Sequence, residues 1–493
     1  MGRFVPAKWT LGNAGSVTLM PQHFDLCVIG TGSGNSVVDE RFSDWSVAVV
    51  ERGTFGGTCL NRGCVPSKML IYPADIVESI RHAAALGVDA HVDSVRWADI
   101  RDRTFGRIDP IVEGGRQYRS HLSNHTVFEV DAHFVGDHLL QLGHGADADR
   151  ITADRFVLAA GARTMVPPDI AGLADIDYHT SDTIMRVDDI PRRLGIIGGG
   201  FIATEMAHVF DAFGSAVTMV TRREGLLLRE DAEISARITD RFAERLDLKR
   251  SARPVRVHRS DGGIVVELDS DAGPPSFECD ALLIATGRIP NGDQLRVEET
   301  GVSLDHDGYV MTDNTLSTGV EGIWALGDIR NSMQLKHLAN LEARVVQHNL
   351  LHPDDRRHVD ERFVPHAVFT SPQIGAVGLT EAEAVARGID VAVAVRSYGG
   401  TAYGWAMEDT TSCAKVIVDR ETRHVVGVHV IGPQASILIQ QVVQGMRFGQ
   451  TVDQMARDVI YPHPALSEVI ENVLLDVIDQ MERTHDTHVA RHG

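Results

Sequence analysis

FDLCVIGTGSGN, residues 24–35, is a short apolar run that ends in a glycine-rich turn. The apolar residues predict a buried strand, and the glycines would let the backbone approach a pyrophosphate at the start of a helix. A second apolar run, residues 47–50, closes with Glu51, where a carboxylate is placed to bond ribose hydroxyls. We therefore expect a strand–turn–helix–strand unit for a dinucleotide, with a glycine turn of another α/β protein as the alternative. Asn35 replaces the third glycine of the usual pattern, which would loosen the packing of helix on strand.

The same pattern recurs as LGIIGGGFIA, residues 194–203, followed by the apolar run of residues 216–220. Two such units in one chain predict two nucleotide-binding domains. The second run ends in Thr221-Arg222-Arg223, at the point where an NAD-binding unit normally carries an acid. Guanidinium groups suit a 2′-phosphate, which an acid would repel. The sequence therefore favours NADPH over NADH, with two solvated surface arginines as the alternative.

The composition is that of an acidic globular protein. Hydrophobic residues make up 43% of the 493 residues, and the net charge is −21. That acidity argues against a nucleic acid or an anionic membrane as partner, because both are bound through basic patches. No apolar run approaches the roughly 20 residues that span a bilayer. Five cysteines are too few for a secreted disulfide scaffold, so we expect a cytoplasmic protein.

Two of the cysteines stand close together in the segment GGTCLNRGCVPSK, residues 56–68. Cys59 and Cys64 have four residues between them and could close a disulfide across one helical turn. A thiolate near a helix N-terminus is stabilised by unpaired backbone N–H groups. The spacing differs from that of paired zinc ligands, and no further cysteine or histidine pair completes a metal site. We expect a redox pair and no metal, with a metal site or inert buried cysteines as the alternatives.

This segment resembles the active-site stretch of the glutathione reductase and dihydrolipoamide dehydrogenase family, and the resemblance extends over residues 23–480. It implies an enzyme that passes electrons from a nicotinamide nucleotide through FAD and the Cys59–Cys64 disulfide to a small-molecule disulfide. The other motifs that carry the resemblance are the two glycine loops, ATGR (285–288), ALGD (325–328) and HPALSE (463–468).

The resemblance also implies roles for individual residues. Lys68 and Glu205 resemble the ion pair beside the flavin N5, and Phe201 stands where glutathione reductase has a tyrosine that gates the nicotinamide pocket. A His-Pro pair alone is more often a turn, but Glu468 could bond His463, which would fix its tautomer and raise its basicity. In the family this dyad comes from the other subunit, which implies a homodimer. The residues expected to contact FAD are Gly30, Gly32, Gly34, Asn35, Glu51, Gly57, Thr58, Gly161 and Asp328. Those expected to contact NADPH are Gly198, Gly200, Phe201, Ile202, Arg222, Arg223 and Gly287.

The expected fold class is α/β, with two doubly wound Rossmann-like nucleotide-binding domains plus an α+β C-terminal dimerisation domain. From about residue 360 the chain predicts an antiparallel sheet with helices. The expected parts are an N-terminal extension (1–22), an FAD-binding domain in two pieces (23–165 and 289–358), an NAD(P)H-binding domain (166–288), the dimerisation domain (359–481) and a disordered tail (482–493).

Four phrases resemble one branch of this family, which reduces the disulfide of an inositol–glucosamine–acetylcysteine thiol. Glutathione disulfide carries several carboxylates and needs cations at the mouth of the site, whereas residues 35–41 are neutral to acidic. An uncharged, hydroxyl-rich disulfide suits that mouth better. Trp405 is a candidate platform for a sugar face, or an ordinary buried interface tryptophan. The four phrases are GTGSGN (30–35), FGRIDP (105–110), YHTSDT (178–183) and YGWAMED (403–409).

Two rival functions share the motifs. The first is dihydrolipoamide dehydrogenase, an NAD-linked component of a 2-oxoacid dehydrogenase complex, against which Thr221-Arg222-Arg223 speaks. The second is a flavin-bearing binding protein without turnover, against which the full set of expected catalytic residues speaks. Thioredoxin and mercuric reductases that carry a C-terminal cysteine pair are disfavoured, because the last cysteine is Cys413.

Overall fold

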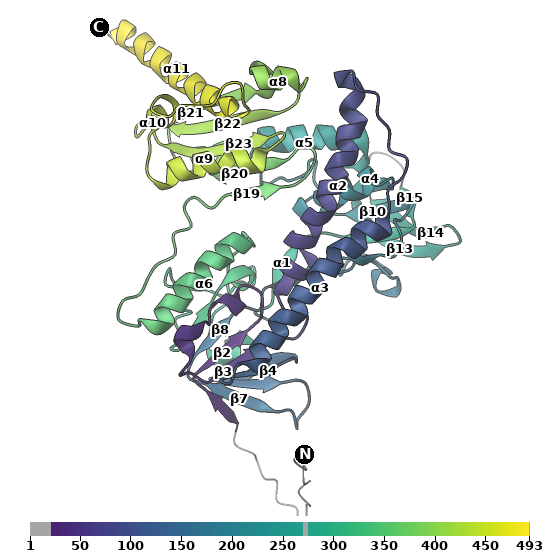
Figure 1. Ribbon diagram of the computed structural model, residues 1–493, viewed down its shortest axis with the longest axis vertical. Helices are drawn as coiled ribbons and strands as arrows, with labels where there is room; N and C mark the ends of the chain where they lie inside the picture. The colour runs from purple at the N-terminus through teal and green to yellow at the C-terminus, as the bar shows by residue number, and fades with distance from the viewer. Residues whose placement is uncertain (1–20, 270–274, 493) are drawn as a thin grey trace, which may run out of the picture.

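A five-stranded parallel sheet carries the first glycine loop at its centre (Figure 1). The computed structural model describes residues 21–269 and 275–492. The strand order of this sheet is β18 (Ile323–Ala325), β8 (Phe156–Leu158), β2 (Leu26–Ile29), β3 (Val47–Val50) and β4 (His125–Phe128). A smaller sheet beside it contains β1 (Gln22–Phe24), β7 (Arg150–Ala153), β6 (Leu139–Leu142) and β5 (Ala132–Gly136). The helices of this part are α1 (Gly57–Arg62), α2 (Cys64–His82), α3 (Trp97–His121) and α6 (Lys336–Leu351).

A second parallel sheet carries the second glycine loop. Its strand order is β12 (Asp247–Lys249), β11 (Ala216–Val220), β10 (Arg193–Ile197) and β16 (Ala281–Ile284), with helices α4 (Phe201–Ala212) and α5 (Ala232–Arg245). An antiparallel sheet of β13 (Arg253–Ser260), β14 (Gly263–Asp269) and β15 (Ser276–Cys279) lies next to it. The chain enters and leaves this part through β9 (Ala162–Thr164) and β17 (Arg288–Pro290), which pair antiparallel.

The C-terminal part is an antiparallel sheet with helices, as the texture of the sequence predicts. The strands are β19 (His366–Val368), β20 (Ile374–Gly378), β23 (Val425–Ile431), β22 (Cys413–Asp419) and β21 (Val391–Ser397). The helices are α7 (Glu381–Ala386), α8 (Ala402–Ala406), α9 (Ala435–Arg447), α10 (Val452–Arg457) and α11 (Ser467–His492). The three parts together form the predicted α/β architecture. None of the helices described is both long and apolar enough to cross a membrane.

The predicted helix after the first glycine loop is not formed. That segment instead contains two short 3-10 turns, η1 (Gly34–Ser36) and η2 (Glu40–Phe42). The Arg119 guanidinium on α3 donates to Asn35 Oδ1 at 2.8 Å, to the Asn35 carbonyl, and to the Val38 carbonyl at 3.2 Å. Backbone groups that a helix would pair internally are thus satisfied from α3. Asn35 therefore fastens the loop to α3 instead of loosening a helix.

The predicted disordered tail is also wrong for residues 482–492, which continue helix α11. No glycine or proline occurs between Pro464 and Gly493 to end the helix. Arg483 forms an ion pair with Asp479 one turn earlier, at 3.8 Å. The predicted N-terminal extension lies outside the described residues as far as residue 20.

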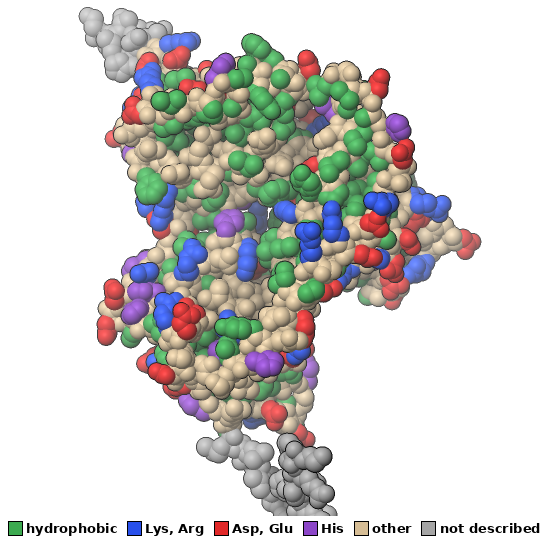
Figure 2. Space-filling view, viewed as in Figure 1, with side chains coloured by type: hydrophobic (Ala, Val, Ile, Leu, Met, Phe, Trp, Pro, Cys, Tyr) green, Lys and Arg blue, Asp and Glu red, His purple; other side chains and the backbone are tan. Residues whose placement is uncertain are grey.

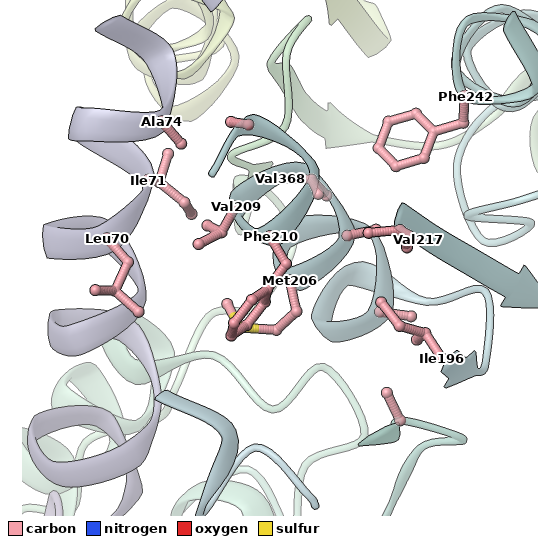
Figure 3. Close-up of a cluster of buried hydrophobic side chains, with 14 of the residues drawn as sticks. Leu70, Ile71, Ala74, Ile196, Met206, Val209, Phe210, Val217, Phe242 and Val368 are labelled. Atoms are coloured by element: carbon pink, nitrogen blue, oxygen red, sulfur yellow. The ribbon is translucent and has the colours of Figure 1, made fainter. Parts of the chain in front are cut away.

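An apolar cluster joins the first part of the chain to the second. Leu70, Ile71 and Ala74 on α2 lie against Met206, Val209 and Phe210 on α4 (Figure 3). All six side chains are buried. The contact crosses between domains, so it fixes the position of α2, which begins at Cys64, relative to α4, which follows the second glycine loop.

Candidate active site

The first glycine loop lies directly against the strand end of β8. Gly30 has φ of +103°, and a Cβ there would lie 2.3 Å from the Ala159 carbonyl oxygen, so no other residue fits. Gly34 begins η1 in the same loop. Glu51, at the end of β3, accepts hydrogen bonds from the Thr31 backbone N–H at 2.9 Å and the Thr31 hydroxyl at 2.7 Å. The loop and the carboxylate thus lie together, as the spacing predicts for a dinucleotide site.

The first residue of α1 touches this loop. Gly57 has φ of +67°, and a Cβ there would lie 2.6 Å from the Cα of Gly32. The close approach places Thr58 and Cys59, the next residues of α1, beside the loop. A dinucleotide bound on the loop would therefore lie next to the cysteine segment.

Cys59 and Cys64 are both free thiols and lie within hydrogen-bonding distance of each other. The hydrogen bond from Cys59 lowers the pKa of the Cys64 thiol to about 7, with help from the charge of Lys68 and against the effect of burial. The same hydrogen bond raises the pKa of Cys59, and burial adds to it. The reduced pair therefore carries its negative charge on Cys64, the sulfur nearer Lys68.

Lys68 and Glu205 form the predicted ion pair. The Lys68 ammonium lies 2.8 Å from both carboxylate oxygens of Glu205, which is almost fully buried. Glu205 Oε1 also accepts from the backbone N–H of Phe369, at 3.0 Å, and the ammonium lies 4.5 Å from the centre of the Phe369 ring. Residues from all three parts of the chain meet at this pair, which lies one helical turn from Cys64.

The second glycine loop has the same close packing as the first. Gly198 has φ of +140°, and a Cβ there would lie 2.2 Å from the Ala285 carbonyl oxygen. Gly200 is the N-cap of α4, Phe201 at the first helical position is 48% exposed, and Ile202 is half-buried. The exposed ring of Phe201 can cover a flat ligand above the loop.

Arg222 and Arg223 follow β11 at the rim of this loop. Both are exposed, and within the described part of the chain neither guanidinium makes a hydrogen bond or an ion pair. Thr221 before them is buried, so no acid occupies the position that would bond a ribose 2′-hydroxyl. The geometry leaves both cations available to an anion.

Gly161 and Gly287 flank the two strands that link the domains. Both have positive φ, +67° and +126°. The carbonyl of Gly161 accepts from the Asn291 N–H at 3.0 Å, and that of Gly287 accepts from the Met165 N–H at 2.9 Å. They lie at the junction that the predicted FAD and NADPH sites share.

Asp328 lies in the turn after β18 and is accompanied by a lysine that sequence reasoning missed. Burial raises the pKa of Asp328, while the charges of Arg288 and Lys336 lower it. Lys336 begins α6, and its ammonium donates to the Ser33 hydroxyl in the first glycine loop at 2.9 Å. No motif includes Lys336, so only the folded chain brings it to the loop.

His463 and Glu468 form the predicted dyad, but far from the cysteines. His463 Nδ1 lies 2.6 Å from Glu468 Oε1, and Glu468 Oε2 also accepts from the Ala465 N–H at 3.1 Å. The bond to His463 lowers the pKa of Glu468, so the carboxylate stays charged. The dyad lies between α10 and α11, which are well separated from α1 (Figure 1). One chain therefore does not bring this histidine to Cys59.

The surface around the dyad is apolar and exposed. The side chain of His463 is 71% exposed, and the nearby Ile460 is 97% exposed. Apolar side chains also gather over the C-terminal part of the molecule (Figure 2). Such a patch is typical of a surface that another protein covers.

The predicted substrate mouth at residues 35–41 is only partly exposed. Val37 and Val38 are buried, and Asp39 pairs with Arg41 at 2.6 Å, so the segment presents little free charge. Trp405 is 65% exposed, and its indole N–H donates to the Gly399 carbonyl at 2.7 Å. Within residues 21–269 and 275–483, His, Cys, Asp and Glu side chains form no group that could hold a metal ion.

Comparisons with known proteins agree with this geometry. Residues 24–343 match the profile of the pyridine nucleotide-disulphide oxidoreductases, and residues 364–474 match the dimerisation domain of the same proteins. The mycothione reductase of Mycobacterium tuberculosis strain H37Rv is 46% identical over 92% of this chain and 99% of its own length. The dihydrolipoyl dehydrogenase of Halobacterium salinarum is 30% identical over 90% of this chain and 94% of its own length.

A solved structure has the same fold. The HOCl-induced flavoprotein disulfide reductase RclA of Escherichia coli, as a C43S mutant in complex with Cu(II), superposes with a TM-score of 0.80. It is 28% identical, and the match covers 92% of this chain and 99% of that one.

Proposed function

The chain belongs to the pyridine nucleotide-disulphide oxidoreductase family, and we propose that it reduces mycothione with electrons from NADPH. Mycothione is the disulfide of the inositol–glucosamine–acetylcysteine thiol. The observation that carries the proposal is the position of Cys59 and Cys64 between the first glycine loop and the Lys68–Glu205 pair. A dinucleotide bound on the loop would thus lie beside both the cysteine pair and the charged pair.

The residues present fit the FAD and pyridine nucleotide that the family uses. At Gly30 and Gly34 a side chain would collide with Ala159. The loop therefore carries no side chains at these two positions, and its backbone is free to approach a diphosphate. Glu51 would hold the adenosine ribose, and Asp328 the ribityl chain. FAD, when bound, accepts a hydride from the nicotinamide and delivers two electrons to the disulfide. Lys68, held by Glu205, supplies a fixed positive charge beside it.

The protein's own residues carry out the disulfide exchange. The thiolate of Cys59 attacks one substrate sulfur, so a mixed disulfide forms and the substrate S–S bond breaks. His463 of the partner subunit, charged after it has taken the Cys59 proton, protonates the departing thiolate. The Cys64 thiolate then attacks the Cys59 sulfur, which re-forms the Cys59–Cys64 disulfide. The second substrate thiolate leaves and takes a proton from water.

A homodimer is part of this proposal, because the dyad of one chain does not reach its own Cys59. The exposed apolar surface around His463 would be covered by the second subunit. Glu468 holds Nδ1 of His463, which leaves Nε2 to face the partner's cysteine.

The choice of NADPH rests on the two exposed arginines after β11. Replacing Arg222 and Arg223 together by alanine is expected to raise the KM for NADPH by about 10- to 100-fold, because charge-assisted contacts with the 2′-phosphate are lost. The KM for NADH, which lacks that phosphate, should change little. Steady-state kinetics with each nucleotide check this.

A double substitution of Arg241 and Arg387 by alanine provides the matched control, because it removes the same charge from α5 and from the end of α7. It should leave the NADPH to NADH ratio unchanged. An unaltered ratio in the Arg222/Arg223 variant would make those arginines ordinary surface residues.

Mycothione is expected to be the preferred disulfide. The acidic chain, with net charge −21, disfavours the polyanionic glutathione disulfide, and the exposed Trp405 can face a sugar ring. We expect kcat/KM for mycothione to exceed that for glutathione disulfide and lipoamide by at least about 100-fold, because a site that hydrogen-bonds the hydroxyls of its substrate discriminates against a disulfide that lacks them. Measuring the three disulfides with NADPH and with NADH tests this. A preference for lipoamide with NADH would instead identify a dihydrolipoamide dehydrogenase.

A further inference from the structure

Lys336 and Asn340, one turn apart on α6, hold the same hydroxyl group of the first glycine loop. The Lys336 ammonium donates to Ser33 Oγ at 2.9 Å, and Ser33 Oγ donates to Asn340 Oδ1 at 3.0 Å. Ser33 lies between Gly32 and Gly34, and a Cβ at Gly34 would lie 2.6 Å from the Cβ of Ala159, so the loop packs closely on this side. The side chain of Lys336 is therefore fixed at the loop.

The ammonium of Lys336 differs from those of the other lysines in the described part of the chain. Lys68, Lys249 and Lys415 each form an ion pair with a carboxylate at 2.8 Å or less. Lys336 is half-buried, yet no carboxylate of residues 21–269 or 275–483 lies within ion-pair distance of it. A half-buried charge without a counter-charge is unfavourable, so the site is suited to an anion that the chain itself does not supply.

The charge of Lys336 also acts on two groups around the loop. The hydrogen bond with Cys64 and burial raise the pKa of Cys59, and burial raises the pKa of Asp328; the charge of Lys336 opposes the rise in both. The ammonium thus lies on the side of the loop that faces the cysteines and the turn after β18.

We propose that Lys336 binds the diphosphate of FAD and neutralises part of its charge. This inference rests on the proposed FAD site at the first glycine loop. Backbone N–H groups of the loop offer only dipoles to a diphosphate, which carries two negative charges. An ammonium already oriented by Ser33 supplies a full charge, and a charge-assisted hydrogen bond to phosphate is about twice as strong as a neutral one.

The test compares FAD affinity of full-length holoenzyme variants. Dilution releases FAD, and the rise in flavin fluorescence gives the dissociation constant. We expect Lys336→Met to weaken FAD binding by about 10- to 100-fold, and Lys336→Arg to stay within about threefold of wild type. Lys249→Met, which removes a lysine from the other nucleotide-binding domain, serves as the matched control and should leave FAD binding unchanged.

A second measurement identifies the part of FAD that Lys336 contacts. ADP contains the diphosphate but not the flavin ring, so its own dissociation constant, obtained from competition with FAD, should rise in the Lys336→Met enzyme by the same factor as that of FAD. Higher salt should reduce the difference in FAD affinity between wild type and Lys336→Met, because salt screens the charge of the ammonium.

Unchanged FAD affinity in Lys336→Met would overturn the inference, as would weakened FAD binding with unaltered ADP binding at the site. If Lys336→Met does not fold, Lys336→Gln and Ser33→Ala carry the same comparison, and equal FAD affinity in both would count against the inference. Wild-type protein that binds no FAD would contradict the proposed function, whereas FAD bound equally by all variants contradicts only the role of Lys336.

Discussion

We expect a mixture of inactive Cys59→Ser homodimers and inactive His463→Ala homodimers to regain activity once subunits exchange. The dyad of one chain lies far from its own cysteines, and its histidine is exposed beside an apolar surface. Each hybrid dimer therefore contains one site with both Cys59 and His463 intact. With equal amounts and free exchange, activity should return to about one quarter of the wild-type value, because half of the dimers are hybrids with one working site of two.

The matched control mixes Cys59→Ser with Cys64→Ser. Both cysteines of a site belong to one chain, on α1 and at the start of α2, so no hybrid of these variants has a complete site. We expect no recovery in that mixture. Each parent variant is assayed for mycothione reduction before mixing, and exchange is verified by mass spectrometry of differently tagged subunits. Failure of the first mixture despite proven exchange would place the catalytic histidine in the same subunit as the cysteine.

The glycine loops could be predicted from the sequence because their signals are local. The strands β2 and β3 around the first loop lie where short apolar runs end in glycine or in Glu51. The second loop likewise opens α4 where the sequence predicts it. In both cases the apolar run and the glycines that follow it are adjacent in the sequence, and this local pattern is enough to recognise the turn. The carbonyl groups of Ala159 and Ala285, which exclude a side chain at Gly30 and Gly198, are brought there only by the fold.

The segment after the first loop could not be predicted in the same way. Its conformation depends on Arg119, which lies 84 residues after Asn35 in the sequence and donates to the backbone carbonyls of Asn35 and Val38, which a helix would have paired internally. The position of Lys336 at the loop could not be predicted for the same reason, because Ser33, to which it donates, lies 303 residues before it in the sequence. The dyad could be recognised from its motif, but its separation from Cys59 is a property of the folded chain alone.

Replacing either cysteine should abolish disulfide reduction, while the two variants differ in their spectra. We expect Cys59→Ser and Cys64→Ser each to lower mycothione turnover by at least about 10³-fold, because each removes a sulfur that must form a disulfide. NADPH-dependent reduction of a quinone, which needs no cysteine, should persist in both and shows that the nucleotide sites are intact. Measuring the two reactions side by side separates loss of the exchange step from misfolding.

The spectra report which sulfur carries the negative charge. A thiolate against oxidised flavin gives a long-wavelength absorbance band, so Cys59→Ser should show the band and Cys64→Ser should not. The pKa of Cys64 is lowered from 9.0 to about 7, so its thiolate is present above that pH and is lost as the pH falls through it. Serine at position 59 can still donate to Cys64, whereas Cys59→Ala removes the donor and should shift the midpoint of the band to higher pH. A band in Cys64→Ser instead of Cys59→Ser would reverse the roles of the two sulfurs.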